Sequence, residues 1–215
     1  MVAAARVPTS WLVVGALVFF AAFFAIGAVV SQEPPYPRDA IATAFFFGQA
    51  TPLAAAITTA GTFPFYAALS IIALVAGFVR RAWLPRAALA VATLVIAWQA
   101  SDVFKALYDR ARPPQSLVFR ETSASYPSGH ATLVVAFWGV WAMYLMMGPR
   151  SSARIAGIVA IVVWILAIGW SRLALGAHYL SDVIGGYLLG LSFVYVATIV
   201  ARWLERRTAA QSKAD

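Results

Sequence analysis

The 215-residue sequence contains no cysteine and very few charged residues. Without cysteine the chain has neither disulfide bonds nor thiolate metal ligands, and the redox state of its compartment is left open. Charged residues make up 11% of the chain and hydrophobic residues 62%, against about 25% and about 45–50% in ordinary soluble domains. So few charges cannot cover a water-facing surface, and so much apolar surface excludes a disordered chain. The composition therefore indicates a polytopic membrane protein.

Long hydrophobic runs are abundant. A bilayer core about 30 Å thick is crossed by about 20 apolar residues in a helix. Such runs predict an all-α fold with six transmembrane helices, at residues 11–30, 63–79, 85–101, 131–147, 155–170 and 183–201. The first is interpreted as a retained helix, because no clean Ala-x-Ala cleavage site ends it. Residues 31–39 are interpreted as a loop, residues 40–60 as short interfacial helices broken at Gly48 and Pro52, and residues 202–215 as a frayed polar tail.

Basic residues are distributed unevenly between the two sides of the predicted membrane. With the N-terminus inside, the inner segments carry ten Lys and Arg residues against two acidic residues, whereas the outer segments carry six against six. This asymmetry follows the positive-inside rule and predicts that both termini are cytoplasmic. The net charge of +8 is then explained by the loops, and we expect no nucleic-acid partner. The sequence carries no signal for an oligomeric state.

Both histidines of the sequence, His130 and His178, fall in the predicted outer segments, and so do Lys105, Arg112 and Arg172. Charges near membrane depth are costly and are usually paired or functional. Taken singly, each cation also fits an interface anchor whose head group reaches toward water. The gathering of all five residues on one side favours a functional site, because anchors would be distributed over both sides.

Two local patterns suit the binding of an anion. If the sixth span begins near Gly176, His178 and Asp182 share a helical face. The carboxylate then fixes the imidazole tautomer and leaves the other nitrogen available as a nucleophile or base. Ser128 is a candidate N-cap for the fourth span, and Gly129 allows close backbone approach to a ligand at the helix N-terminus. Each pattern alone fits a purely structural role equally well.

Lys105 and Arg112 are seven residues apart, so an extension of the third span by about two turns would place them on one side. A salt bridge from Lys105 to Asp109 is the structural alternative for this segment. Arg110 lies off that face and is interpreted as solvated. Tyr126 is interpreted as an interface tyrosine rather than as a contact to a lipid headgroup.

In chain order these residues form three motifs: Lys105 with six residues before Arg112-Pro113, then Pro127-Ser128-Gly129-His130, then Ser171-Arg172 with five residues before His178 and three more before Asp182. The pattern resembles the type 2 phosphatidic acid phosphatase (PAP2) superfamily. The six-span layout is similar to that of the integral-membrane lipid phosphatases in this superfamily. The motifs cover residues 105–182 of what we expect to be a single membrane domain, residues 1–215.

The resemblance implies a role for each matching residue. It makes His178 the nucleophile, held by Asp182, and it makes His130 the group that protonates the leaving oxygen and later activates water. The residues that it implies for holding the phosphate are Lys105, Arg112, Ser128, Gly129 and Arg172. It implies no metal and no other cofactor.

The residue types agree with this chemistry, because two arginines and a lysine beside a helix N-terminus can stabilise the charge of a transferring phosphoryl group. We expect a bacterial inner-membrane enzyme whose site faces the periplasm or cell exterior and hydrolyses a lipid phosphomonoester or pyrophosphate. Candidate substrates are undecaprenyl pyrophosphate, phosphatidylglycerol phosphate and phosphatidic acid. Residues 40–60 are a candidate path for the lipid tail.

Three other functions compete with this interpretation. A phosphotransferase of the same fold would carry the same motifs. An anion transporter would distribute its charges through the membrane depth, whereas the predicted span interiors are essentially uncharged. A scaffolding protein would have no need for the paired histidines. The sequence therefore favours an enzyme.

Overall fold

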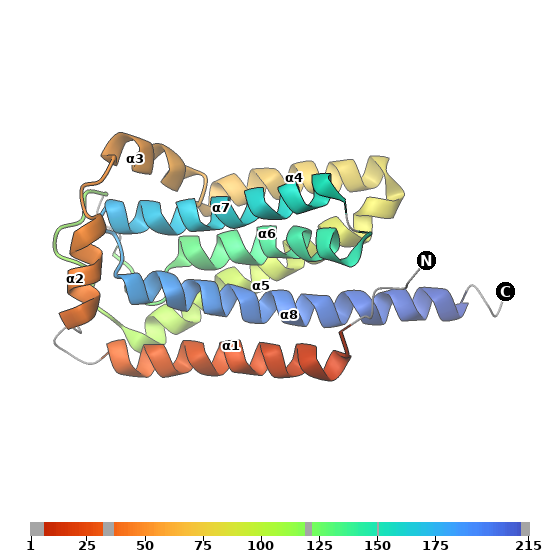
Figure 1. Ribbon diagram of the computed structural model, residues 1–215, viewed down its shortest axis with the longest axis horizontal. Helices are drawn as coiled ribbons and strands as arrows, with labels where there is room; N and C mark the ends of the chain where they lie inside the picture. The colour runs from red at the N-terminus through yellow and green to blue at the C-terminus, as the bar shows by residue number, and fades with distance from the viewer. Residues whose placement is uncertain (1–6, 32–36, 119–121, 150, 212–215) are drawn as a thin grey trace.

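The computed structural model describes residues 7–31, 37–118, 122–149 and 151–211, and within these ranges every regular element is a helix. The helices are α1 (Thr9–Val30), α2 (Pro37–Phe46), α3 (Thr51–Thr59), α4 (Phe63–Val79), the short 3-10 helix η1 (Arg81–Trp83), α5 (Leu84–Tyr108), α6 (Gly129–Met147), α7 (Ser152–Ala174) and α8 (Leu180–Gln211). Figure 1 shows α1, α4, α5, α6, α7 and α8 as a bundle of roughly parallel rods. The predicted all-α fold is confirmed.

Five segments are long and apolar enough to cross a bilayer: α1, η1 with α5, α6, α7, and α8. Helix α4 is shorter, with 17 apolar residues, which is about 26 Å at 1.5 Å per residue and lies at the lower end of the spanning range. With α4 the bundle contains the six predicted helices.

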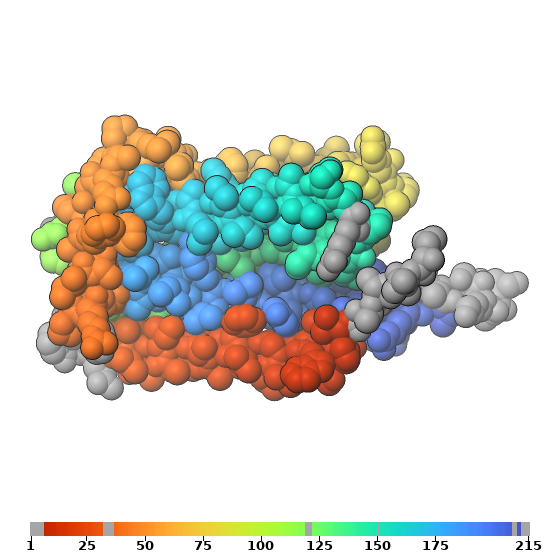
Figure 2. Space-filling model, viewed as in Figure 1, coloured from red at the N-terminus to blue at the C-terminus, as the bar shows by residue number. Residues whose placement is uncertain are grey.

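Helices α2 and α3 are the predicted short helices between the first and second spans, and their axes are bent by 103°. The break falls where Gly48 and Ala50 both adopt positive φ, at 79° and 42°, which an α-helix does not tolerate. Helix α2 lies across one end of the bundle (Figure 1), and Figure 2 shows its atoms and those of α3 covering that end. This part of the chain therefore closes the end of the bundle.

Two predicted boundaries are wrong. Residues 202–211 continue α8 as far as Gln211, because this segment contains no glycine or proline and is rich in helix-forming residues. Residues 212–215 of the predicted tail lie outside the described residues. The predicted loop at residues 31–39 is also too long, since α2 already begins at Pro37, and this places Asp39 in the first turn of a helix.

Helix α8 packs between α1 and α6. Its contact with α6 is close because Gly186 and Gly190 face the neighbouring backbone. A Cβ atom at Gly186 would lie 2.6 Å from the Ser128 carbonyl oxygen, and one at Gly190 would lie 2.7 Å from Val135 Cβ. Small residues four apart are typical of tightly packed membrane helices. At the same place, the Ser128 amide donates a hydrogen bond to the Asp182 carbonyl (3.0 Å), so the beginnings of α6 and α8 are joined directly.

The two ends of the bundle differ in their charges. Helix α1 begins and α8 ends at the end that also holds η1 (Figure 1), where Arg80, Arg81 and Arg206 are exposed. The opposite end holds α2 and residues 109–118 and 122–128. All three motifs meet at this second end.

Candidate active site

The structure brings both histidines and the three predicted cations together. Lys105 lies in the last turn of α5 and Arg172 in the last turn of α7. His130 lies in the first turn of α6, close enough to interact electrostatically with His178, Arg172, Lys105 and Arg112. The convergence that the sequence predicted is therefore present in the fold.

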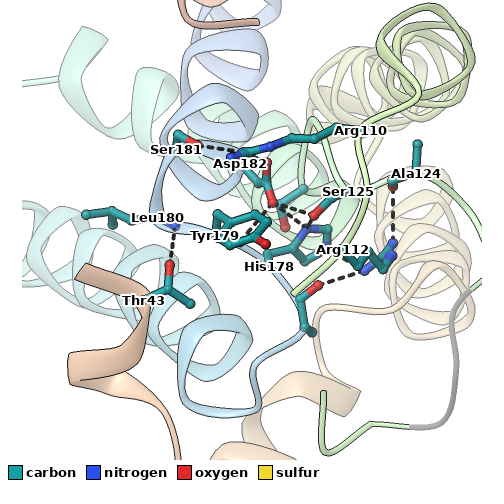
Figure 3. A network of polar contacts seen from close by, with 12 residues as sticks. Thr43, Arg110, Arg112, Ala124, Ser125, His178, Tyr179, Leu180, Ser181 and Asp182 are labelled. Atoms are coloured by element: carbon teal, nitrogen blue, oxygen red, sulfur yellow. Dashed lines mark hydrogen bonds and ion pairs between the residues drawn. The ribbon is translucent and has the colours of Figure 1, made fainter. Parts of the chain in front are cut away.

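His178 is almost completely buried, with 1% of its surface exposed. Its Nδ1 lies 3.5 Å from Asp182 Oδ2 and 3.5 Å from Ser125 Oγ, and its Nε2 lies 3.2 Å from Arg112 Nη1 (Figure 3). One ring nitrogen thus faces a carboxylate and the other faces a cation. The expected pairing is present, but its expected origin is wrong. Helix α8 begins at Leu180, so His178 precedes the helix rather than sharing a face with Asp182.

Asp182 is fully buried and is bonded on several sides. Its Oδ2 accepts the Tyr179 backbone amide at 2.8 Å and also accepts the hydroxyl of Ser125. Its Oδ1 is paired with Arg110. These bonds fix the orientation of the carboxylate that faces His178. Ser125 was missed by the sequence reasoning, although it lies only three residues before Ser128 of the second motif.

Arg110 contradicts the prediction of a solvated side chain, because only 5% of its surface is exposed. It pairs with Asp182 and, at 2.8 Å, with Asp39 of α2. The error arises because α5 ends at Tyr108 and the chain turns at Asp109, whose φ is 40°. Beyond that turn, helical-face geometry no longer applies.

The charge of Arg110 is maintained by its partners. Burial alone would lower the pKa of Arg110, but the negative charges of Asp182 and Asp39 and their hydrogen bonds raise it above its ordinary value. The guanidinium also lies over the ring of Tyr179, 4.3 Å from the ring centroid. Arg110 is therefore a permanent positive charge between two buried carboxylates.

Arg112 is held by backbone and side-chain acceptors rather than by an extended helix. Its Nε donates to the Ser123 carbonyl (2.8 Å), its Nη1 to the Ala177 carbonyl (2.9 Å) and its Nη2 to Ser123 Oγ (3.2 Å). Lys105 Nζ donates to the same Ser123 hydroxyl at 3.4 Å. The loop after α5, and not two further helical turns, thus brings Arg112 beside Lys105. Ser123 was missed because it lies outside the motifs.

Arg172 and His130 are contacted by α3 and the turn that follows it. Arg172 is buried, and its Nη1 donates to Thr58 Oγ1 of α3 at 2.7 Å. Gly61 packs against the His130 ring so closely that a Cβ atom there would lie 2.6 Å from His130 Cδ2. Both short helices, α2 and α3, therefore contact residues of the site.

Ser128 occupies the predicted N-cap position of α6 but does not cap the helix with its side chain. Its buried Oγ has no hydrogen-bond partner within the described part of the chain. Gly129 lies next to Lys105, since a Cβ atom at Gly129 would lie 3.5 Å from Lys105 Nζ. A buried hydroxyl, helix amides and an ammonium group thus lie together, and such groups suit an anionic oxygen.

A cavity of about 400 Å³ adjoins these groups. Its lining includes Lys105 and His130 together with the apolar side chains of Phe63, Trp98 and Leu133. The rings of Phe63 and Trp98 stack, with centroids 4.1 Å apart. Of the described residues 40–60, none lines this cavity, so the lipid-tail path expected there is not the space that adjoins His130.

Tyr126 is a core residue and not an interface tyrosine. Its side chain is fully buried, its hydroxyl donates to the Phe23 carbonyl (2.6 Å), and its ring stacks on Phe23 with centroids 5.3 Å apart. A Cβ atom at Gly185 would collide with this ring. Tyr126 therefore packs α1 against α8.

This helical bundle has the fold of a known membrane enzyme. It matches the crystal structure of a transmembrane PAP2-type phosphatidylglycerolphosphate phosphatase from Bacillus subtilis, with a TM-score of 0.75 at 23% identity. The match covers 85% of this chain and 93% of that chain. The family model of the PAP2 superfamily matches residues 81–206, which include all three motifs. The chain belongs to the PAP2 superfamily, and the resemblance stated from the motifs is confirmed.

Several similar proteins are named as lipid phosphatases. The chain is 32% identical over 98 residues to phosphatidylglycerophosphatase B of Bacillus subtilis, covering 45% of this chain and 48% of that protein. It is 35% identical over 88 residues to phosphatidylglycerophosphatase B of Escherichia coli (41% and 32%). It is 34% identical over 91 residues to undecaprenyl-diphosphatase of Sulfolobus acidocaldarius (41% and 40%). The matches span less than half the length of these relatives.

Proposed function

We propose that the chain is a membrane-embedded lipid phosphatase that hydrolyses a lipid phosphomonoester or pyrophosphate through a phosphohistidine intermediate. The observation that carries the proposal is the setting of His178, whose Nδ1 faces Asp182 while its Nε2 faces Arg112. A carboxylate at Nδ1 keeps the proton there and leaves the Nε2 lone pair available for attack. An arginine beside Nε2 is placed to bind the phosphate under attack.

In the first step, His178 Nε2 attacks the phosphorus, a P–N bond forms and the bond to the leaving oxygen breaks. His130, as imidazolium, gives its proton to that oxygen. Negative charge spreads over the three equatorial oxygens. The groups that we assign to these oxygens are Lys105, Arg112, Arg172, the hydroxyl of Ser128 and the backbone amide of Gly129.

In the second step, the now neutral His130 removes a proton from water. The water oxygen attacks the phosphorus, the P–N bond breaks, and phosphate is released with both histidines restored to their starting states. Three fixed cations supply the positive charge that many phosphatases obtain from metal ions. We therefore propose a metal-independent reaction.

The cavity supports a lipid substrate, because Lys105 and His130 line it together with the apolar side chains of Phe63, Trp98 and Leu133. A phosphate beside Lys105 and His130 would leave the apolar lining for an attached hydrocarbon chain. The names of the relatives support phosphatidylglycerol phosphate and undecaprenyl pyrophosphate as candidate substrates, and phosphatidic acid has the same chemistry.

The orientation that we propose follows from charge. The end of the bundle opposite the site carries exposed arginines, and the positive-inside rule assigns such an end to the cytoplasm. The site then faces the periplasm or cell exterior of a bacterial inner membrane, with the two chain ends in the cytoplasm. Cysteine labelling of single-cysteine variants at Arg38 and Arg206 tests this, with Arg38→Cys expected to react from outside.

Phosphate release from the purified protein in detergent, with the three candidate lipids and with excess EDTA, tests the activity. We expect release that EDTA leaves unchanged and that His178→Ala abolishes. Loss of activity in EDTA would contradict metal independence. Transfer of the phosphoryl group to an added acceptor lipid, without release of phosphate, would identify a phosphotransferase instead.

A further inference from the structure

A buried charged network extends from the site to α2, outside the three motifs. Asp39 lies in the first turn of α2 and is almost completely buried. Its Oδ2 accepts a hydrogen bond from Arg110 Nη2 (2.8 Å), and Arg110 in turn pairs with Asp182, which faces His178. Asp39 also lies outside residues 81–206, the part of the chain matched by the family model.

Asp39 makes a second set of contacts to the beginning of α8. Its Oδ1 accepts the Ser181 backbone amide at 2.9 Å, and its Oδ2 also accepts the Ser181 hydroxyl. That hydroxyl accepts a hydrogen bond from Arg110 Nη1 at 2.7 Å. Thr43, one turn further along α2, accepts the Leu180 amide at 3.1 Å. Side chains of α2 thus satisfy the amides at the N-terminus of α8, where an anionic group is also favoured by the helix dipole.

The charges of this network suit the chemistry at His178. Asp39 and Asp182 carry two negative charges, and Arg110 between them carries one positive charge, so the group has a net charge of −1. His178 becomes positively charged when Nε2 bonds to phosphorus while Nδ1 keeps its proton. Charge interactions inside a protein are strong because the local dielectric constant is low. Without Asp39, the remaining Arg110–Asp182 pair would be neutral. Asp182 would then be the remaining carboxylate paired with Arg110 in this network.

We propose that Asp39 is a positioning residue for the nucleophile: through Arg110 it orients Asp182 and keeps a net negative charge beside His178. This inference rests on the proposed phosphohistidine mechanism. It makes α2 part of the catalytic apparatus rather than only a cover over the end of the bundle. Asp39 itself touches neither the substrate nor the reacting nitrogen.

Asp39→Asn tests the proposal, because it keeps the shape of the side chain and removes its charge. We expect kcat to fall roughly 10- to 100-fold, as small misplacements of reacting groups do, with KM for the lipid changed less than threefold. The amount of labelled phosphoenzyme formed in the first turnover should fall in parallel. Ser181→Ala keeps both charges but loosens the network, and we expect a smaller fall in kcat of the same kind.

Arg38→Gln is the matched control, since it removes an exposed charge from the neighbouring position of α2 and should leave kcat unchanged. An unchanged kcat in folded Asp39→Asn overturns the inference, and so does an effect confined to KM. If Asp39→Asn does not fold, an unchanged kcat in Ser181→Ala overturns it instead. His178→Ala is measured alongside: its full activity would overturn the proposed mechanism itself, whatever Asp39→Asn does.

Discussion

The two histidines of the site lie in contrasting surroundings. His178 is buried, with Asp182 and Ser125 at one ring nitrogen and Arg112 at the other. His130 is only partly buried, lines the cavity, and packs against Gly61. One half of the site, around His178, is therefore enclosed by polar partners, whereas the other half, around His130, borders the cavity.

The difference matches the two tasks that we assign. A nucleophile attacks one atom from one direction, so a single ring orientation and tautomer are an advantage. A general acid and base must meet a leaving oxygen in one step and a water molecule in the next, so it needs access to a space that both can enter. In the proposed mechanism, the rigid part of the site lies beside the phosphorus and the cavity lies beside the leaving group.

The largest expected effect comes from removing the buried imidazole. His178→Ala should lower turnover by a factor on the order of 10³ or more, because the covalent step is lost. Phosphate release should fall by this factor, and no labelled phosphoenzyme should be trapped. Thr198→Val is a suitable control, since Thr198 is a buried residue of α8 whose hydroxyl donates to the Val194 carbonyl in the next turn toward the site. Normal formation of the phosphoenzyme in His178→Ala would contradict the assignment of His178 as the nucleophile.

The effect of substituting His130 on turnover should depend on the leaving group. His130→Ala should lower turnover of a lipid phosphate by about 10²- to 10⁴-fold, the usual contribution of general acid–base catalysis. With p-nitrophenyl phosphate the first step should survive, because the nitrophenolate leaves without a proton. Stopped-flow absorbance should then show a burst of nitrophenolate that approaches the enzyme concentration, followed by slow turnover. Equal losses of rate in the first and second steps would contradict the assignment of leaving-group protonation to His130.

An intermediate effect is expected from Gly61, which packs against the His130 ring. Gly61→Ala places a methyl group 2.6 Å from His130 Cδ2, so the ring must move, and we expect kcat to fall roughly 10- to 100-fold. Gly157→Ala is the matched control, because the nearest atom there is the flexible end of Leu145 at 3.2 Å. Steady-state kinetics of both variants measure this change in kcat. Equal activity of the two variants would show that Gly61 does not set the position of His130.

The smallest effect should come from Tyr126, to which we assign no role beside either histidine. Tyr126→Phe removes the hydrogen bond to the Phe23 carbonyl and should cost about 1 kcal/mol of stability, with kcat and KM unchanged. Thermal unfolding in detergent and lipid kinetics measure the two quantities. A raised KM for the lipid would assign the hydroxyl to the substrate instead.

The spans and the three motifs were predictable because their signals are local. Apolar runs of fixed length indicate helices in lipid, and the spacing of Arg172, His178 and Asp182 can be read along the chain. Helix ends were less predictable, because hydropathy reports where a helix lies in lipid and not where it continues beyond it. The prediction therefore ended the last span at residue 201, whereas α8 extends to Gln211.

The network around Asp182 could not be predicted in the same way. Asp39 and Arg110 are 71 residues apart, and no periodicity relates a proline-rich segment to a turn after another helix. Arg110 is two residues from Arg112, yet a local turn at Asp109 decides which of them meets the carboxylates. Such pairings depend on the tertiary arrangement of α2 and α8, which a single sequence does not encode as a pattern.

The direct bond between the Ser128 amide and the Asp182 carbonyl, together with the glycines below it, has an evolutionary implication. Main-chain atoms join the beginnings of α6 and α8 there, so surface substitutions elsewhere on these helices should change the spacing of the two elements little. Diversification toward lipids of other sizes should then accumulate around Phe63, Trp98 and Leu133, whose exchange alters the volume available to a hydrocarbon chain without touching the reacting groups. Chemistry and substrate choice would drift independently in descendants of this protein.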